Sequence, residues 1–412
     1  MDKPPLGQAY RRNTFAALSY PNYRLWFFGQ MTSLFGTWMQ STAQGYLVYQ
    51  LTRSEAYLGY VGFASGIASW VFTLYGGVIA DRVPRRTLLV ITQSLSMLLA
   101  FVLSALAFTH LVAPWHVIVL AFMLGVVNAF DAPARQSFVL EMVDRPVLTN
   151  AIALNSTMFN AAVAVGPSLG GLTYWLFGPA WCFAINGLSF VAVIAALLAM
   201  KFAPWTPPAR KGAALRDMRE GLRAVAADRR ILALILLVGA VGLFGMSFAT
   251  LLPAWAVEVL GGDSRTNGFL QSARGIGALA AALGIASLAH RRFKGKVITA
   301  VSLLYPVVLL LFSFTRSLPL SLLTLLAVGA ANITVINLAN SLLQSLVPDA
   351  VRGRVMGMYT LSFFGFMPIG ALLAGGAATA VGVPVTVAIS AACFLGCAVA
   401  VTLAVPSIRR LG

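Results

Sequence analysis

Long apolar runs, each bounded by short polar or basic stretches, recur along the whole chain of 412 residues. A helix that crosses a bilayer needs roughly 20 mostly apolar residues, because its backbone polar groups must be satisfied within the segment. We interpret about twelve runs as spanning helices, at residues 25–51, 56–80, 87–108, 116–138, 151–176, 181–202, 231–257, 267–289, 297–314, 319–346, 356–380 and 385–405. Only 10% of the residues are charged, against about 25% in soluble proteins. The sequence therefore predicts an all-α integral membrane protein.

The charged residues are strongly unbalanced, with 29 Lys and Arg against 12 Asp and Glu and a net charge of +17. In a soluble protein this excess would indicate nucleic-acid binding. Here all but four basic residues lie on one side of the predicted spans; the exceptions are Arg53, Arg265 and Arg316 on the other side and Arg274 inside a span. Basic loops remain in the cytoplasm. We therefore expect both termini in the cytoplasm of a bacterial cell, a multi-pass protein of the inner membrane, and no nucleic-acid partner.

The spans divide into two groups of six. We expect a cytoplasmic N-terminal segment (1–23), a first six-helix bundle (24–202), a linker (203–230), a second bundle (231–405) and a cytoplasmic tail (406–412). The linker combines prolines with a charged stretch suited to a helix on the membrane surface. The sequence Gly-Val-Val-Asn at 125–128 recurs as Gly-Ala-Ala-Asn at 329–332. These features predict two repeated bundles that rock about a site near the membrane midplane. The first run is too long for a signal peptide, so we expect it to remain as the first span.

The loop after the second span reads GVIADRVPRR and contains Gly77, Asp81, Arg82, Arg85 and Arg86. It resembles the loop signature of the major facilitator superfamily, G-x-x-x-D-R-x-G-R-R, with proline in place of the second glycine. A glycine that permits close approach, a carboxylate at the membrane edge and clustered arginines suit a polar latch. Loop charges set only by topology are the alternative.

A partner for this loop lies in the fourth span, where Asn128, Asp131 and Arg135 share one helix face. The resemblance implies that Arg85 or Arg86 pairs with Asp131, while Asp81 faces the helix start near 353–355. Charged groups inside a membrane are costly unless paired. Proton coupling and ordinary interfacial charge remain alternatives to the latch.

The fifth span contains GPSLGG, with Gly166, Pro167, Gly170 and Gly171. It resembles the antiporter motif of the superfamily, and generic small-residue packing is the alternative. Further segments, including NAFDAPARQ and VPDAVRGRV, extend the likeness over residues 22–405. They resemble the drug:proton antiporter subgroup that includes macrolide efflux pumps and exporters of catecholate siderophores. This resemblance implies export of amphipathic compounds driven by inward proton flow.

Neutral polar side chains form a stripe on the first span and a second group on the tenth. The expected cavity residues are Gln30, Ser33, Thr37, Gln40, Gln44, Asn128, Asn332, Asn337, Asn340 and Arg274. A polar stripe in a bilayer is expected to face a cavity or another helix. Arg274 has no acid within a turn of its own helix, so its partner is Glu258, an anionic substrate, or water reached by snorkelling.

The sequence lacks the residues that several other kinds of chemistry would need. The first span has no carboxylate, which leaves Asp131, Asp81 and Glu258 as proton-coupling candidates. No phosphate-binding loop is found, which argues against direct ATP drive. The histidines lie in or beside loops, and Cys182, Cys393 and Cys397 are expected as free thiols, so we expect no metal and no cofactor.

We therefore expect a monomeric secondary transporter that exports amphipathic small molecules in exchange for protons through alternating access. Its partners would be the small-molecule substrate, protons and the lipid bilayer. Uptake or flipping of a nutrient or lysolipid by the same fold is the alternative within transport. A polytopic membrane enzyme is a third hypothesis, and it would need a carboxylate or histidine pair beside a large loop, which is not found; we expect no enzyme.

Overall fold

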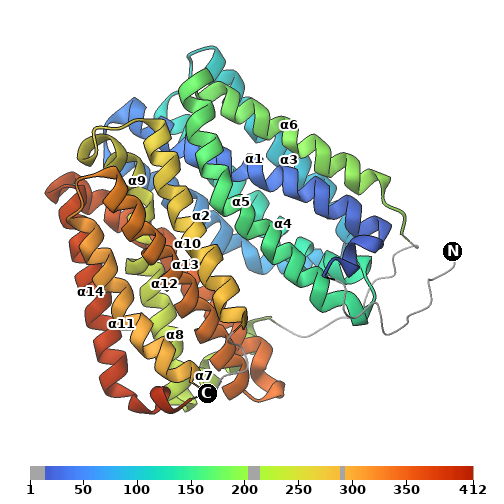
Figure 1. Cartoon of the computed structure of the whole chain (residues 1–412). Helices are drawn as coiled ribbons and strands as arrows, with labels where there is room; N and C mark the ends of the chain where they lie inside the picture. The colour runs from blue at the N-terminus through green and yellow to red at the C-terminus, as the bar shows by residue number, and fades with distance from the viewer. Residues whose placement is uncertain (1–13, 203–213, 288–292, 412) are drawn as a thin grey trace.

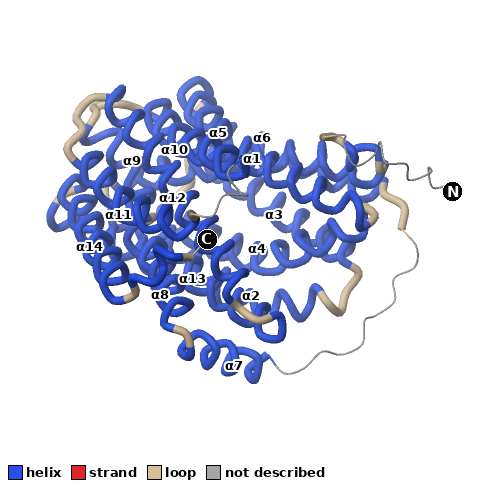
Figure 2. Tube along the Cα trace, turned by 60° about the horizontal axis from the view of Figure 1, so that its bottom comes forward, coloured by secondary structure: helices blue, strands red, loops and turns tan. Residues whose placement is uncertain are grey.

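The computed structural model describes residues 14–202, 214–287 and 293–411. Throughout these residues the chain is helical and contains no strand, as Figure 2 shows. The first half contains α1 (Pro21–Thr52), α2 (Glu55–Ala80), α3 (Arg85–Phe108), α4 (Pro114–Met142), α5 (Leu148–Phe177) and α6 (Pro179–Ala199). The second half contains α8 (Arg229–Ala240), α9 (Leu252–Ala254), α10 (Ser264–Ser287), α11 (Lys294–Ser313), α12 (Leu318–Leu346), α13 (Asp349–Val381) and α14 (Val383–Ala404).

Nine helical segments of the described residues are long and apolar enough to cross a membrane. They are α3, α4, α6, the segment from α8 to residue 259, and α10 to α14. The predicted fold class is thus confirmed, and the spans are confirmed in nine positions. At the other three positions the chain forms α1, α2 and α5, which are 32, 26 and 30 residues long.

Proline and glycine set the helix boundaries in matching places of the two halves. Proline occupies the first turn of α4, α6, α12 and α14, where its missing N–H costs no hydrogen bond. Gly178 joins α5 to α6 with φ of 85°, and Gly382 joins α13 to α14 with φ of 83°. Such left-handed backbone favours glycine. The two halves therefore use the same single-glycine turn before their last helix.

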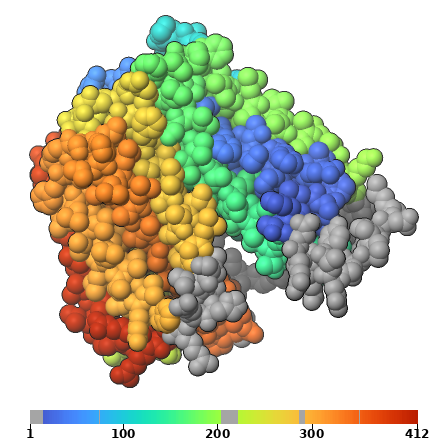
Figure 3. Space-filling view, in the orientation of Figure 1, coloured from blue at the N-terminus to red at the C-terminus, as the bar shows by residue number. Residues whose placement is uncertain are grey.

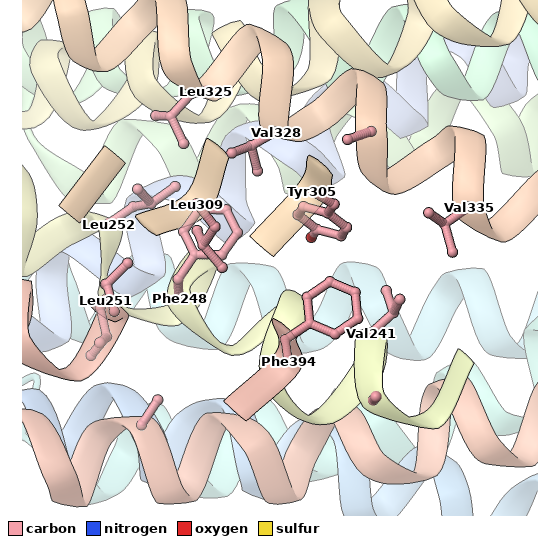
Figure 4. Close-up of a cluster of buried hydrophobic side chains, with 14 of the residues drawn as sticks. Val241, Phe248, Leu251, Leu252, Tyr305, Leu309, Leu325, Val328, Val335 and Phe394 are labelled. Atoms are coloured by element: carbon pink, nitrogen blue, oxygen red, sulfur yellow. The ribbon is translucent and has the colours of Figure 1, made fainter. Parts of the chain in front are cut away.

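The seventh predicted span is a broken helix. After α8 the chain passes through the π-helical segment η4 (Val241–Gly245), the 3₁₀ segment η5 (Ser247–Leu251), α9 and the π-helical segment η6 (Trp255–Val259). Interruptions of this kind free backbone carbonyls, which must find other partners inside a membrane. The Tyr305 hydroxyl donates to the carbonyl of Gly245 at 2.6 Å. Figure 4 shows this tyrosine beside Phe394 in the apolar core of the second half.

The linker continues as α7 (Ala214–Ala227), which packs against the start of α13. At Gly221 a Cβ atom would lie 3.2 Å from the carbonyl of Arg354. The predicted linker helix is therefore present over residues 214–227, and it contacts the second half. The remaining linker residues, 203–213, lie outside the described residues.

The two halves form bundles placed side by side, with α1 and α3 to α6 on the right of Figure 1, α8 to α14 on the left, and α2 between them. The largest contacts between them are those of α2 with α13 and of α5 with α10. We call the side that carries the connections α2–α3, α4–α5 and α12–α13 the basic face, because most Lys and Arg of the described residues lie there. The other side, with the connections α1–α2, α5–α6 and α13–α14, is the opposite face.

Candidate functional site

Glycines allow α2 and α13 to meet near the opposite face. A Cβ atom at Gly66 would lie 2.2 Å from Cγ of Pro368, and one at Gly59 would lie 2.8 Å from the carbonyl oxygen of Ala371. Real Cβ atoms do not approach other atoms so closely, so this packing depends on glycine. The contact lies in the first half of α2 and the second half of α13.

The GPSLGG segment lies where α5 packs between α1 and α10. A Cβ atom at Gly171 would lie 2.4 Å from the carbonyl of Ser264 on α10, and one at Gly170 would lie 2.7 Å from the carbonyl of Met39 on α1. The other two members of the motif make similar contacts, Gly166 with Trp38 and Pro167 with Gly268. The segment therefore seals one half against the other on the side of the opposite face.

At the basic face the same helices diverge. A Cβ atom at Gly77, near the end of α2, would meet nothing within 4 Å. The same is true of Gly353 and Gly357 in the first turns of α13. Figure 3 shows the two halves in contact at the top of the view and a hollow between them lower down. The molecule is thus closed at the opposite face and open at the basic face.

Asp131 is 3% exposed and lies inside the first half. Its Oδ1 atom accepts hydrogen bonds from Thr92 at 2.9 Å and Gln93 at 2.7 Å, both on α3. Its Oδ2 atom pairs with Arg135 at 3.2 Å, one turn along α4. The carboxylate is therefore fully partnered within its own half and does not face the second half.

The expected pairing of Arg85 or Arg86 with Asp131 is wrong in this structure. Arg85 forms an ion pair with Glu141 near the end of α4, and Arg86 donates to the carbonyl of Leu198 at 2.8 Å. The reason is depth: Asp131 is level with Thr92, which is seven residues or about 10 Å along α3 from Arg85. Sequence reasoning missed Glu141, although its place near the end of α4 puts it level with the start of α3.

Asp81 and Arg82 are exposed in the turn after α2. The expected contact of Asp81 with the start of α13 is not made in this structure: among the described residues no ion pair joins Asp81 to α13, and Arg352 of α13 pairs with Asp349 of its own helix. The divergence of α2 and α13 at the basic face separates these two parts. The loop signature thus lies at the open end of the molecule, and its adjacent arginines, Arg85 and Arg86, bind residues of the first half.

The polar stripe of α1 does not line an open cavity as expected. Four of its five side chains, Gln30, Ser33, Gln40 and Gln44, are less than 8% exposed, and Thr37 is half-buried. Gln40 accepts a hydrogen bond from Asn186 of α6 at 2.7 Å. Gly36 lets α6 come close, because a Cβ atom there would lie 2.4 Å from Oγ of Ser189. Sequence reasoning missed Asn186 and Ser189, the polar pair on α6 that signals this contact.

The remaining expected cavity residues are more accessible. Asn128 and Asn337 are exposed, and Asn332, Asn340 and Arg274 are half-buried. Oδ1 of Asn332 is buried without a hydrogen-bond partner among the described residues. The Arg274 side chain forms no ion pair within the described part of the chain, so the expected pairing with Glu258 is not made. A groove of about 500 Å³ between α1, α5 and α6 is lined mainly by apolar side chains such as Phe35, and it lies outside the space between the halves.

Polar contacts that sequence reasoning missed cross the seam near the opposite face. Tyr49 of α1 donates a hydrogen bond to Glu258 of η6. Ser264 donates to the carbonyl of Gly171 at 3.1 Å, and Ser272 accepts from the backbone of Ser168 at 3.0 Å. These bonds join the halves where the backbones are closest.

The loop before α10 carries a local ion pair on the same side. Asp263 pairs with Arg265 at 2.9 Å, and the Arg265 guanidinium lies 4.0 Å from the ring centre of Trp175. Partial burial raises the pKa of Asp263, but the hydrogen bonds from Arg265 and Thr266 outweigh it and hold the pKa below the ordinary value. Among the described residues no group of three His, Cys, Asp or Glu side chains is placed to hold a metal ion.

Comparisons with known proteins agree with this architecture. The profile of the transmembrane secretion effector family matches residues 12–411. The chain is 28% identical to the multidrug efflux pump Tap of Mycolicibacterium fortuitum, over 93% of this chain and 95% of that one. It is 25% identical to the staphyloferrin A transporter of Staphylococcus aureus (84% and 87%) and 25% identical to the enterobactin exporter EntS of Shigella boydii (90% and 88%).

Solved structures share the fold at low identity. A bacterial homologue of the human lysosomal transporter Spinster, in an inward-facing and occupied conformation, superposes with a TM-score of 0.71 at 14% identity, over 94% of this chain and 97% of that one. The nucleoside transporter NupG gives 0.70 at 17% identity, over 94% and 98%.

Proposed function

Because the chain belongs to the transmembrane secretion effector family of major facilitator transporters, we propose that it exports amphipathic small molecules from the cytoplasm, in exchange for protons. The candidate substrates are drug-like or siderophore-like compounds, since relatives over most of the chain are a multidrug efflux pump and siderophore transporters. The protein would work as a monomer in the inner membrane of a bacterium, with the basic face and both termini in the cytoplasm.

One observation carries this proposal: the halves are sealed at the opposite face and open at the basic face. An alternating-access transporter must pass through such a state, and the second state follows when the halves rock about their contacts. The seals consist of glycine-rich helix surfaces, α2 on α13 and α5 on α10, and only a few side-chain hydrogen bonds cross them. In the inward-open state, substrate would enter from the cytoplasm between the halves.

The accessible polar groups suggest how a substrate is held. Asn128 of the first half and Asn337 of the second are exposed, and Arg274 offers a cation with no ion-pair partner among the described residues. A cation inside a membrane protein is costly unless an anion reaches it. An amphipathic compound with an anionic group would satisfy Arg274.

Reconstitution in liposomes tests the proposal. With the protein inserted in one orientation, an imposed pH gradient should drive candidate drugs and siderophores out through the opposite face several times faster than equal pH on both sides. Dissipating the gradient with an ionophore should abolish the difference. Equal rates with and without the gradient would reject proton antiport, and no movement of any compound would reject export of this substrate class.

A further inference from the structure

Two carboxyl groups from different halves meet in the seal at the opposite face. Glu55 begins α2 in the first half, and Glu258 lies in η6 of the second half. The two carboxyl groups lie within hydrogen-bonding reach of each other. Glu258 also accepts a hydrogen bond from Tyr49, and Glu55 accepts one from Thr379 of α13 at 3.4 Å. The pair is therefore held between α1 and α2 on one side and η6 and α13 on the other.

The closed seam encloses Glu55. The whole residue is 8% exposed. The backbone of α13 lies directly on the backbone of Glu55, since a Cβ atom at Gly375 would be 2.7 Å from the Glu55 carbonyl oxygen. This close contact exists only because the halves are pressed together at the opposite face. Opening that face must separate Glu55 from Glu258.

Neither carboxyl group has a cationic partner, as judged from residues 14–202, 214–287 and 293–411. The same face carries Arg53, exposed at the end of α1, and Arg265, which is paired with Asp263. The other titratable groups nearby are the phenols of Tyr46 and Tyr49 on α1, Tyr57 and Tyr60 on α2, and Tyr174 on α5. The ends of α13 and α14 at this face carry no charged residue. Two like charges in contact cannot both remain ionised without a large cost.

We propose that Glu55 and Glu258 form a proton-binding site that exists only while the opposite face is closed. One proton, taken from water at that face, lies between the two carboxyl groups and removes one negative charge. When it leaves, two carboxylates repel each other across the seam and the halves separate. A ligand shifts an equilibrium by its different affinity for the two states, so external protons favour the state that is closed at this face. This inference rests on the proposed alternating access.

Distance measurements between spin labels test the site. Labels at Leu51→Cys on α1 and Val381→Cys on α13 report on the opposite face, since both positions are exposed at its helix ends. The background carries Cys393→Ser and Cys397→Ser, while Cys182 is buried. In nanodiscs the fraction of long distances should rise by about threefold or more between about pH 5 and pH 9. In Glu55→Gln and in Glu258→Gln it should stay low at every pH, because one charge is removed permanently.

Asp263→Asn is the matched control, because it removes another carboxylate of the same face that is already paired with Arg265. It should keep the wild-type pH dependence. Tyr49→Phe removes the phenol but neither carboxyl group, so it should raise the long-distance fraction and retain its rise with pH. A pH-independent wild type overturns the proposal without any variant, as does a wild-type response in both Gln variants or its loss in Asp263→Asn.

The measurement uses neither a substrate nor a gradient, so its outcome is separate from that of the proposed antiport. If a pH gradient drives export but the opening of the opposite face does not depend on pH, only the proposed proton site is overturned. If the opening of the opposite face depends on pH but the transport rate does not depend on the gradient, only the proposed antiport is overturned.

Discussion

At the scale of single residues, Asp131 shows how the first half accommodates a charge. Two hydrogen bonds from α3 and an ion pair with Arg135 compensate for its burial, which would otherwise cost several kcal/mol. Glu141, by contrast, holds Arg85 at the partly exposed edge of the same helix pair. The two acids therefore differ in what their loss should do.

We expect Asp131→Ala to lower the free energy of unfolding by about 1–3 kcal/mol, because it leaves buried donors without an acceptor. Glu141→Ala should cost less than about 1 kcal/mol, since its pair is solvent-accessible. Thermal unfolding of the purified variants, followed by tryptophan fluorescence, compares the two. Equal losses would show that Asp131 is not the structural centre of this network.

Asp228 offers a second residue-scale prediction, at the start of α8. Its Oδ1 atom accepts a hydrogen bond from the backbone N–H of Arg230 at 2.8 Å. Hydrogen bonding from the Arg230 side chain holds the pKa of Asp228 below its ordinary value of 3.8. The folded pKa is lowered, so the stabilisation is present above the ordinary value and is lost as the pH falls through the folded value.

At neutral pH, Asp228→Ala should cost about 0.5–2 kcal/mol of stability through the lost helix cap. The difference from wild type should shrink below about pH 4. Asp228→Asn retains a capping oxygen, and its smaller cost serves as the control. Melting temperatures measured across this pH range decide the matter, and a constant difference between Asp228→Ala and wild type would contradict the titration.

At the scale of helices, function depends on surfaces from which side chains are missing. In the α5–α10 contact, Gly275 and Gly268 of α10 fit against backbone carbonyls of α5, as Gly171 of α5 fits against α10. Backbone cannot move aside as the end of a flexible side chain can. The broken seventh span is different, because its π-helical segments interrupt the regular hydrogen-bond pattern of the helix beside the seam.

Gly171→Leu should therefore hold the opposite face open and lower transport by at least about tenfold, while the protein still folds. The matched control is Gly396→Ala, because a Cβ atom there would meet nothing within 4 Å. Transport in liposomes and size-exclusion profiles would be measured together. Normal transport by a well-folded Gly171→Leu protein would show that the seal does not need close backbone contact.

At the scale of the whole molecule, the two bundles meet at one end and part at the other. In substrate-free protein, cysteines at Ser168 and Ser272 should cross-link readily, since backbone and side chain there are 3.0 Å apart. Cysteines at Gly77 and Gly353 should cross-link slowly, because both sites are open. Substrates that favour the outward-open state should reverse the two rates, as read from gel mobility. Equal, unchanging rates for both pairs would contradict rocking of the halves.

The sequence predicted local features well where a local cause sufficed. The helix boundaries follow proline and glycine, and the close packing of GPSLGG follows from small residues on one helix face. The sequence correctly placed the polar residues of α1 on a single helix face. It did not predict which helix packs against that face. Its partner was decided by Asn186 and Ser189, about 150 residues away on α6.

By itself the sequence determined the membrane environment, the helical fold class and the family. Apolar length and loop charge are properties of a segment alone, and bilayer physics interprets them without knowledge of neighbours. Only the tertiary structure decided which charges meet. Arg85 reaches Glu141 instead of Asp131 because depth along packed helices controls contact, and Glu55 meets Glu258 because the two halves close at one face. Electrostatic partners depend on distances between helices, which no periodicity within one helix encodes.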